Sequence, residues 1–437
     1  MTTPLRCLLI ADLRHASPRW PALAGGLIAK GWDVTVVTAP IGADAAEELG
    51  FPRIFAERAR IVACGSSTDA LEPIRKLLWL LGLRRKQSLT AQLRAQLPAA
   101  GSRSAFDTVF QTILALIGWP DLQAPWRGPA LHAARALLRE QSFDVLVSSS
   151  PYPTSHAVAA ALKQEHPQLR WVADFRDLWS QNHNYPMPRW RQRVDSRLER
   201  RMISGADALV TTSDDWADTL REAHGKPVAV VRNSFVDYET PAAGAPPATT
   251  PLTVLYTGVR YPKQQHITPV LEAVAALAAS GAATPQELTL RFVGPFDAEL
   301  ARESERLGVA AFVAQDGAVT RAAAQRLQRE AHVLLYMQWE DRAVDMVSAL
   351  KYWEYLGSGR PVLMTGGHPG GTAETIAIEA QAGTIAHTPT EIADALRRWI
   401  AELKRTGAVA SHLRREVTAP YGATARAQEL AQVLNTS

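Results

Sequence analysis

A stretch rich in Pro, Ala and Thr at residues 240–251 divides the chain, and the same pattern of strands and helices begins on either side of it. The stretch reads Thr-Pro-Ala-Ala-Gly-Ala-Pro-Pro-Ala-Thr-Thr-Pro, which has no hydrophobic periodicity and is typical of a linker. In both halves, short apolar runs of strand length alternate with longer segments of helical character. This alternation predicts two α/β domains, each a doubly wound parallel sheet covered by helices.

The first half opens with a strand, a helix and a second strand at the spacing of a right-handed parallel crossover. In this half we predict strands at residues 7–11, 33–38, 143–148, 170–174, 208–212 and 228–231, and helices at 18–30 and 155–164. In the second half we predict strands at 253–257, 289–293 and 333–336, and helices at 268–279, 322–331 and 424–434. The expected organisation is a first domain at 1–239, a linker at 240–251, a second domain at 252–417 and a C-terminal segment at 418–437.

Composition narrows the possible partners and compartments. At 437 residues the chain is too long for one typical core, and its 47% hydrophobic and 21% charged residues are ordinary for a soluble globular protein. The net charge of +4 is too small to indicate nucleic acid, but it suits anionic small molecules or an anionic membrane face. Only Cys7 and Cys64 occur, and we recognise neither a signal peptide nor an apolar run of about 20 residues. We therefore expect a cytoplasmic protein.

A helical insertion at about residues 71–126 interrupts the alternation of the first half. It contains Arg-Lys-Leu-Leu-Trp-Leu-Leu-Gly-Leu-Arg-Arg-Lys at 75–86 and a second apolar stretch at 106–119. Cations on both sides of a short Leu and Trp core are typical of a helix that lies in the membrane interface. The segment predicts peripheral contact with an anionic membrane surface. The alternative is a helical hairpin packed on the first domain.

The most informative motif of the second half lies at residues 348–363, Ser-Ala-Leu-Lys-Tyr-Trp-Glu-Tyr-Leu-Gly-Ser-Gly-Arg-Pro-Val-Leu. Lys351 and Glu354 are three residues apart, so they share one face of a predicted helix that ends at the glycines and is followed by a strand. The N-terminus of such a helix suits a phosphate, and Glu354 could accept hydrogen bonds from the two hydroxyls of a ribose. The alternative is an ordinary helix with an exposed Lys–Glu pair.

A second motif follows the strand at 253–257, where Gly258, Arg260 and Lys263 lie at the carboxyl end. Ligands of open α/β sheets bind at such ends. The bidentate fork of arginine and the point charge of lysine together suit a pyrophosphate. A basic surface loop without a ligand is the alternative.

On these two motifs the chain resembles GT-B glycosyltransferases of the family-4 type, whose donor helix often reads Lys-x-x-Glu-Tyr followed by Gly-x-Pro-Val. The resemblance implies two Rossmann-like domains facing a cleft and a final helix that crosses back to the first domain. It implies a hexosyltransferase-type enzyme that moves a sugar from a nucleotide-diphosphate sugar to an acceptor hydroxyl. Members mostly retain the anomeric configuration, and GT-B enzymes generally need neither a metal nor another cofactor.

The resemblance also assigns roles to residues of the second half. Arg260 and Lys263 would stabilise the departing diphosphate, although Lys263 comes one residue earlier than in the family pattern. Lys351 would add charge, and Glu354 would hold the ribose. Gly258 and Tyr355 would complete the donor site.

Two motifs of the first half carry further candidates. Asp-Phe-Arg-Asp-Leu-Trp at 174–179 resembles the Arg-Asp-x-Trp box of sugar transferases that build surface polysaccharides, so Asp177 could orient an acceptor hydroxyl or the donor sugar. An Arg176–Asp ion pair that only holds the loop is the alternative. The Ser- and Pro-rich turn at 148–156 resembles a family turn in which Ser150 would contact the donor sugar. His156 would be a polar contact or a proton carrier, or else a structural histidine.

The chain also departs from the family pattern. The Gly-rich turn after the first strand is missing, so Arg14 or Arg19 would have to replace its backbone donors near the phosphate. Met346 stands where many relatives have Glu. The glycines at 366–371 lack Gly-Lys-(Ser/Thr), so they are not a P-loop but a turn near the donor.

Rival functions remain open on the sequence alone. One is a GT-B-like sugar-nucleotide epimerase, and the other is a non-catalytic partner subunit. The acceptor of a transferase would be a lipid-linked sugar in surface polysaccharide or glycolipid synthesis, which suits the segment at 71–126, or else a soluble metabolite or natural product.

Overall fold

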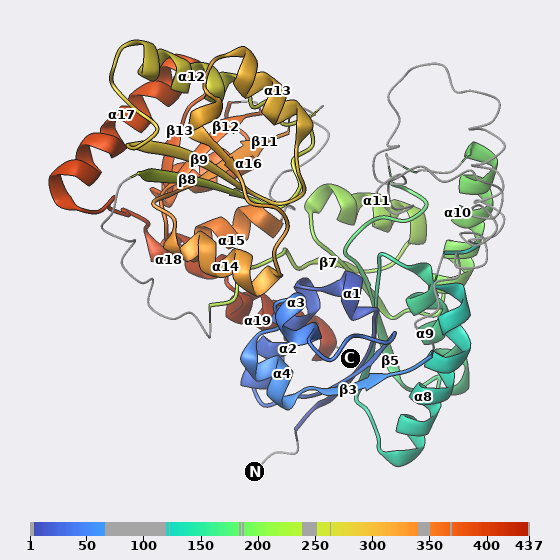
Figure 1. The fold of residues 1–437 in the computed structure, drawn as a ribbon. Helices are drawn as coiled ribbons and strands as arrows, with labels where there is room; N and C mark the ends of the chain where they lie inside the picture. Colours follow the sequence, from blue (N-terminus) through green and yellow to red (C-terminus); the bar gives the residue numbers. More distant parts are fainter. Residues whose placement is uncertain are drawn as a thin grey trace. The chain divides into compact units, whose positions relative to one another are not determined.

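The computed structural model divides the chain into two compact units (Figure 1). Unit 1 comprises Met1–Ala43, Ile54–Val231 and Glu429–Ser437, and unit 2 comprises Asp44–Arg53 and Arg232–Gln428. The residues that the structure describes are 4–65, 119–121, 123–182, 185, 188–237, 251–262, 264–339, 350–367 and 369–435. The basic and apolar segment at 75–86 and most of the predicted insertion at 71–126 lie outside them.

Unit 1 is built on a parallel sheet of seven strands in the order β3-β2-β1-β4-β5-β6-β7. The strands are β1 (Arg6–Ile10), β2 (Asp33–Thr38), β3 (Arg60–Ala63), β4 (Val145–Ser149), β5 (Arg170–Phe175), β6 (Ala208–Thr211) and β7 (Val228–Val230). The chain proceeds outward from β1 to β3 and then returns to β4, beside β1. The strand order therefore reverses between β1 and β4, and ligands of such sheets bind at the carboxyl ends beside this reversal.

Helices cover the sheet of unit 1, because its strands carry apolar side chains toward both faces. Asp12 accepts a hydrogen bond from the N–H of Arg14 at the start of α1, and Gly225, with a φ of 62°, follows the end of α11. The helices are α1 (Leu13–Ala16), α2 (Arg19–Ala29), α4 (Arg53–Arg58), α8 (Arg127–Glu140), α9 (Pro153–Glu165), α10 (Arg189–Ile203) and α11 (Asp214–His224), with a 3-10 turn η1 (Ala124–Trp126).

Unit 2 repeats this topology with six strands in the order β10-β9-β8-β11-β12-β13, again all parallel. The strands are β8 (Leu252–Thr257), β9 (Leu288–Val293), β10 (Val313–Gln315), β11 (Val333–Gln338), β12 (Val362–Gly366) and β13 (Gly383–Ile385). Here the order reverses between β8 and β11. The carboxyl ends of β8, β9 and β11 are therefore the expected ligand edge of this unit.

The strands of unit 2 are connected by helices of both layers. They are α12 (Thr268–Ala279), α13 (Ala298–Arg306), α14 (Arg321–Glu330), α15 (Leu350–Ser358), α16 (Thr372–Glu379), α17 (Pro389–Thr406) and α18 (Arg415–Thr418), with 3-10 turns η2 (Ala310–Phe312) and η4 (Ala419–Tyr421). A short helix α3 (Ala45–Glu48) also belongs to this unit. The last helix, α19 (Ala423–Asn435), begins in unit 2, and its residues from Glu429 onward belong to unit 1.

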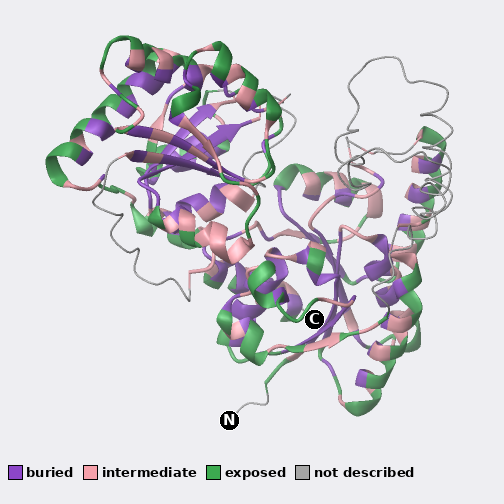
Figure 2. Cartoon of the chain, viewed as in Figure 1, coloured by how far each residue is buried: buried purple, intermediate pink, exposed green. Residues whose placement is uncertain are grey.

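The central strand β8 shows how the core of unit 2 is layered. Val254 and Tyr256 belong to a cluster with residues of α12 and α17, whereas Leu255 belongs to a cluster with residues of α15 and α16. Successive side chains of a strand point to opposite faces, so β8 is covered on both sides (Figure 2). This burial holds the strand ends, and hence the loops that follow them, in fixed positions.

The predicted class of two doubly wound α/β domains is confirmed by these sheets. The helix that carries Lys351 and Glu354 ends at Ser358, before Gly359, which has a φ of 73°, and β12 follows, as the motif predicts. Among the described residues, no helix combines the length and apolar character that spanning a bilayer requires.

Candidate functional site

Two glycines meet at the carboxyl ends of β8 and β9. Gly258 directly follows β8 and has a φ of 94°, a left-handed value that favours glycine. Gly294 directly follows β9, and a Cβ atom there would lie 2.3 Å from the carbonyl oxygen of Gly258. The two backbones therefore touch. No side chain of either residue occupies this edge, where parallel α/β folds bind ligands.

Lys351, in the first turn of α15, reaches the same edge. Its Nζ lies 3.8 Å from the centre of the Tyr256 ring and 3.5 Å from the position that a Cβ atom of Gly258 would have. Burial lowers the pKa of Lys351 to about 7. The structure thus brings two predicted donor residues, Gly258 and Lys351, together. An anion bound beside this amine would favour its charged form.

Tyr355 holds the end of β8 in place. Its hydroxyl accepts a hydrogen bond of 2.9 Å from the N–H of Thr257, and burial raises the pKa of Tyr355 to about 12. The Thr257 hydroxyl also accepts a hydrogen bond of 2.9 Å from Nε2 of Gln328 on α14. The predicted donor residue Tyr355 therefore acts on the backbone next to Gly258, with its own hydroxyl buried.

Glu354 forms an ion pair with Arg321, the first residue of α14. The side chain of Glu354 is 14% exposed and that of Arg321 is 24% exposed, so the pair lies near the surface of unit 2 without being freely solvated. The alternative of a Lys351–Glu354 pair is not seen, because Lys351 lies over Tyr256. Arg321 was missed from the sequence, since nothing in the chain pattern links it to a carboxylate 33 residues later.

Arg260 has acidic and carbonyl partners within unit 2. It is buried, and its Nε and Nη2 donate hydrogen bonds of 2.5 and 3.0 Å to the carboxylate of Asp297. Its Nη1 donates one of 2.9 Å to the carbonyl of Gln265. Burial would raise the pKa of Asp297, but hydrogen bonds from Arg260 and from the N–H of Leu300 lower it overall. The guanidinium thus holds the start of α13, and a diphosphate would have to compete with Asp297 for it.

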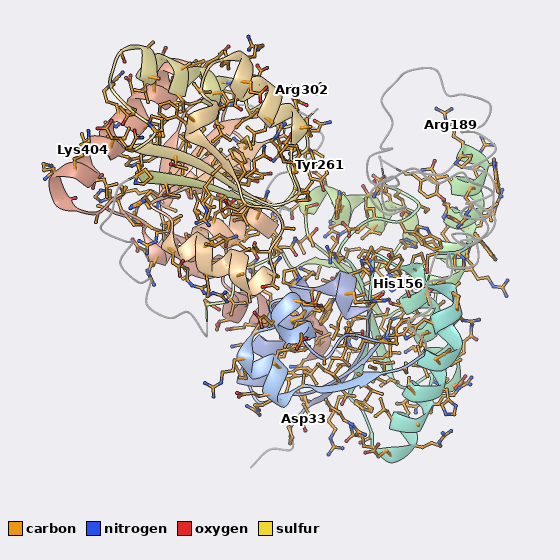
Figure 3. The ribbon with its side chains drawn as sticks, viewed as in Figure 1. Asp33, His156, Arg189, Tyr261, Arg302 and Lys404 are labelled. Carbon is orange, nitrogen blue, oxygen red and sulfur yellow. The ribbon has the colours of Figure 1, made fainter. Side chains whose placement is uncertain are left out.

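A cavity of about 310 Å³ lies beside this ion pair. It is lined by residues of the loops after β8 and β9, among them Gly258, Arg260, Phe296 and Asp297. The rings of Trp339 and of Tyr261, in the same loop after β8, have centroids 5.4 Å apart, and Figure 3 labels Tyr261. The cavity is therefore at the ligand edge of the sheet, next to Gly258. Lys263, the other predicted phosphate residue of this loop, lies outside the described residues.

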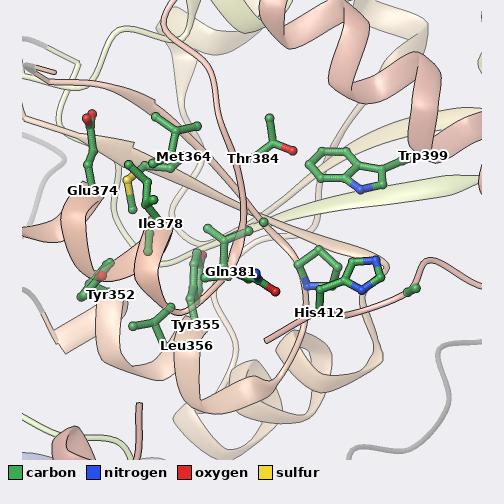
Figure 4. A pocket seen from close by; sticks show the side chains of 17 residues that line it. Tyr352, Tyr355, Leu356, Met364, Glu374, Ile378, Gln381, Thr384, Trp399 and His412 are labelled. Carbon is green, nitrogen blue, oxygen red and sulfur yellow. The ribbon is translucent and has the colours of Figure 1, made fainter. Parts of the chain in front are cut away.

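A larger cavity of about 520 Å³ lies elsewhere in unit 2 (Figure 4). Pro361, Val362 and Gly383, from the amino ends of β12 and β13, contribute to its wall together with Ile378 and His412. Because ligands of parallel α/β sheets bind at the carboxyl ends, we place the candidate site at the smaller cavity. In the part of the chain that the structure describes, no group of three or more His, Cys, Asp or Glu side chains is arranged to hold a metal ion.

In unit 1 the structure brings Ser150 and Asp177 together, beside the reversal of strand order. The Ser150 hydroxyl accepts a hydrogen bond of 3.2 Å from the N–H of Asp177 and donates one of 3.3 Å to the Asp177 carbonyl. The Asp177 carboxylate is 44% exposed and lies 3.2 Å from Nε of Arg176. Ser150 therefore positions the loop after β5. Asp177 both pairs with Arg176, as the alternative proposed, and presents oxygen atoms to solvent.

Sequence reasoning missed two aromatic side chains at this edge. The rings of His15 and Tyr152 meet edge to face with centroids 4.9 Å apart, and Nε2 of His15 lies 3.4 Å from the Tyr152 hydroxyl. Arg176 also donates a hydrogen bond to the His15 carbonyl. The position of His15 on α1, the short helix that follows β1, was the available signal. These residues and Asp177 form a polar edge on unit 1 that could receive a hydroxyl-bearing ligand.

His156 lies among the side chains that fill unit 1, as the structural alternative for this residue expected (Figure 3). Its Nδ1 is 2.8 Å from the hydroxyl of Ser148, and its ring stacks on Phe175 with centroids 4.8 Å apart. Burial lowers the pKa of His156 to about 4, so the ring is neutral at neutral pH. His156 is a core residue here, and its burial argues against a proton transfer to substrate.

The arginines proposed to replace the missing Gly-rich turn are also engaged. Arg19 donates a hydrogen bond of 2.9 Å to the buried carboxylate of Asp174, which also accepts bonds from Trp20 and Ser149. Arg14 forms an ion pair of 2.7 Å with Asp12. The ion pair between Arg19 and Asp174 is almost completely buried, so Arg19 stabilises the sheet of unit 1 and is not available to a phosphate.

Solved structures agree with this architecture. Sucrose-phosphate synthase from Thermosynechococcus elongatus is similar, with 14% sequence identity, a TM-score of 0.52 and a match that covers 98% of each chain. The apo form of the lipopolysaccharide outer core galactosyltransferase WaaB is similar with 11% identity and a TM-score of 0.50, over 98% of this chain and 99% of that one. Identities this low show a shared fold, which is GT-B.

The family comparison concerns the other kind of similarity, that of sequence. No curated protein sequence matches the chain. The family described as glycosyl transferase 4-like domain matches residues 16–234, half of the 437 residues. The matched range contains the Ser150 and Asp177 edge of unit 1, whereas the resemblance in the donor motifs comes from unit 2. Both halves of the chain therefore lead to one conclusion: this protein belongs to the glycosyl transferase 4-like family.

Proposed function

We propose that the protein transfers a sugar from a nucleotide-diphosphate sugar to an acceptor hydroxyl, with the donor held by unit 2. The observation that carries this proposal is the position of Lys351, whose Nζ lies beside the left-handed Gly258 at the carboxyl end of β8. The amine lies over Tyr256 and beside Gly258, and both of these residues also line the cavity of about 310 Å³. This combination suits a nucleoside diphosphate, because the backbone leaves room for the phosphates and the amine supplies charge.

In the proposed reaction, the bond between the anomeric carbon and the diphosphate oxygen breaks. The acceptor oxygen forms the new bond to that carbon and passes its proton to the departing diphosphate. Negative charge grows on the departing diphosphate, so a cation beside it stabilises the transition state more than the ground state. We assign this role to Lys351, with Lys263 as the second cation, because Arg260 is engaged by Asp297. The reaction is proposed to need no metal and, following the family resemblance, to retain the anomeric configuration.

Glu354 is proposed to accept hydrogen bonds from the ribose hydroxyls of the donor. Its ion pair with Arg321 supports this role, because the pair orients the carboxylate, which retains further acceptor positions. A nucleoside lacking both hydroxyls would lose these bonds. The ion pair with Arg321 would also be present if Glu354 had only a structural role, so only the effect of Glu354→Gln on nucleotide affinity separates the two roles.

The acceptor is proposed to bind at the polar edge of unit 1, where Asp177 would orient its hydroxyl. A lipid-linked sugar acceptor in surface polysaccharide or glycolipid synthesis is favoured by the basic and apolar sequence at 75–86. The protein would then act at the cytoplasmic face of a membrane. The family match favours this transferase over the epimerase and over a non-catalytic subunit.

The test is a panel of nucleotide-diphosphate sugars screened by thermal stabilisation. A ligand at 100 times its dissociation constant adds about 2.7 kcal/mol to the free energy of unfolding. We expect at least one nucleotide to stabilise the wild-type protein and not Lys351→Met, with binding unchanged in EDTA. The matched control is Lys30→Met, which removes an exposed lysine from unit 1. Equal stabilisation of wild type and Lys351→Met would show that Lys351 does not bind the nucleotide. Nucleotide binding that requires a divalent metal would overturn the metal-free mechanism.

A further inference from the structure

Helix α10 (Arg189–Ile203) of unit 1 has charged residues on both of its sides. Those on the inner side are buried and paired, whereas those on the outer side are exposed. Its inner side buries Arg191, Asp195 and Glu199. Nε of Arg191 lies 2.8 Å from Asp195, and Nε2 of His224 lies 2.9 Å from Glu199. The two carboxylates of the helix are therefore buried and already partnered, so they do not neutralise charge on its outer side.

The outer side of α10 is strongly basic. Five of its arginines are exposed, and none of them forms an ion pair with another described residue: Arg189, Arg193, Arg197, Arg200 and Arg201. At 100° per residue these positions fall within about 120° of the helix circumference, and the helix rises about 18 Å from the first to the last of them. Figure 3 shows Arg189 directed away from the body of unit 1. The arginines thus form one continuous stripe.

Two apolar side chains extend the same side. Trp190 is 45% exposed and Val194 is 40% exposed, and both fall within about 140° of the start of the arginine stripe. Exposed residues along α10 are visible in Figure 2. A basic helix face that carries Trp among its arginines suits an anionic membrane surface, where Trp prefers the interface and arginine binds phosphodiesters through two hydrogen bonds.

We propose that the outer side of α10, formed by these five arginines with Trp190 and Val194, docks unit 1 on an anionic lipid surface. A stripe confined to about a third of the circumference of one helix can face a planar array of phosphates. Trp190 and Val194 favour lipid over nucleic acid. Apolar side chains gain free energy by entering the apolar part of a bilayer, and the backbone of a nucleic-acid duplex has no such part. This surface deepens the proposed function, because it would hold the enzyme where a lipid-linked acceptor is confined, but it does not depend on donor chemistry.

The experiment uses the full chain and vesicles of phosphatidylcholine, with or without phosphatidylglycerol. We expect co-sedimentation with the anionic vesicles only, weakening as salt rises. Each arginine near such a surface contributes about a fivefold affinity, so Arg193→Glu/Arg197→Glu/Arg200→Glu is expected to bind at least about 100-fold more weakly. The matched control, Arg139→Glu/Arg398→Glu/Arg405→Glu, makes the same charge change at exposed arginines of other helices and should bind nearly as the wild type does.

Several outcomes would overturn the proposal. The first is that the wild type does not bind the anionic vesicles at low salt. The second is that both triple variants lose the same vesicle affinity. The third is that the α10 variant still binds the vesicles whereas Leu78→Glu/Trp79→Glu does not. A mixed-sequence oligonucleotide that displaces the protein from vesicles at equal phosphate concentration would assign the surface to nucleic acid instead. Thermal unfolding and nucleotide affinity of the α10 variant should match the wild type. If no nucleotide binds any variant while vesicle binding follows α10, the proposed function fails and this inference stands.

Discussion

The hydroxyl of Tyr355 accepts a hydrogen bond of 2.9 Å from the backbone N–H of Thr257. This bond joins α15 to the end of β8, so the helix that carries Lys351 is held against the strand that presents Gly258. The position of the amine relative to the bare backbone thus depends on one phenol. We place Tyr355 among the positioning residues of the donor site for this reason.

Tyr355→Phe is expected to lower the free energy of unfolding by about 1–3 kcal/mol, because a buried N–H loses its acceptor. It should also weaken nucleotide binding, since the end of β8 is released. Tyr352→Phe is the matched control, because the Tyr352 hydroxyl donates a hydrogen bond of 2.7 Å to the Ala373 carbonyl, away from Gly258. Chemical denaturation and calorimetry measure both effects. Equal loss of nucleotide affinity in the two variants would show that Tyr355 has no special role.

The lowered pKa of Lys351 predicts that the free energy of unfolding depends on pH. Burial lowers its pKa from 10.5 to about 7, so between these values the unfolded chain holds a proton that the folded protein lacks. The free energy of unfolding should therefore rise with pH in this window, by up to about 1.4 kcal/mol per pH unit from this group. Lys351→Met should lose that rise, whereas Lys30→Met should keep it. Denaturation curves from pH 7 to pH 10 with the same slope in wild type and Lys351→Met would contradict the shift.

Glu354→Gln tests the ribose role. A hydrogen bond to a charged group contributes roughly 1.5–3 kcal/mol, so affinity for a nucleoside diphosphate should fall by about 10-fold or more. Calorimetry with the corresponding 2′,3′-dideoxy nucleotide supplies the control, because that ligand lacks both hydroxyls and should bind wild type and variant alike. If the ribose and dideoxy nucleotides lose the same affinity, Glu354 acts only through its pair with Arg321.

Much of the fold was predictable because unit 1 and unit 2 obey simple patterns. The predicted bounds 33–38 and 268–279 agree with β2 and α12 residue for residue. The edge strands β10 and β13 were missed, since three residues are too few to show a period. Helix α10 was missed for a different reason: its inner side buries charged residues that find partners elsewhere in the fold, so the expected apolar stripe is absent.

The site was predictable in its residue types but not in its pairings. Gly258 and Lys351, which the sequence assigned to the donor site from two separate motifs, lie together because β8 and β11 are neighbours in the sheet. The partner of Arg260 could not be foreseen, since Asp297 is 37 residues away and reaches it only through the turn before α13. The choice between the two roles of His156 could not be made from the sequence, because a sequence does not show whether a helix start is buried.

If Arg260 serves mainly to pair with Asp297, its removal should affect stability, whereas a residue that binds the diphosphate should affect turnover. Arg260→Ala should lower the free energy of unfolding by about 1–3 kcal/mol, because the carboxylate of Asp297 would remain partly buried without its cation. The double variant Arg260→Ala/Asp297→Ala should recover part of that loss. Denaturation of the two single variants and the double variant measures the coupling. If Arg260→Ala keeps its stability but loses most of its turnover, Arg260 binds the diphosphate after all.

The contact between Gly258 and Gly294 bears on how donor preference could be altered. A side chain at Gly294 would push into the Gly258 carbonyl, so neither strand end can be used to enlarge, shrink or recharge the pocket without moving the loop itself. We expect selection among sugars and bases to come from residues farther along the loops after β8 and β9, several of which line the cavity of about 310 Å³. Efforts to re-engineer the donor, or to compare relatives with different donors, should look there and treat the two glycines as fixed scaffold.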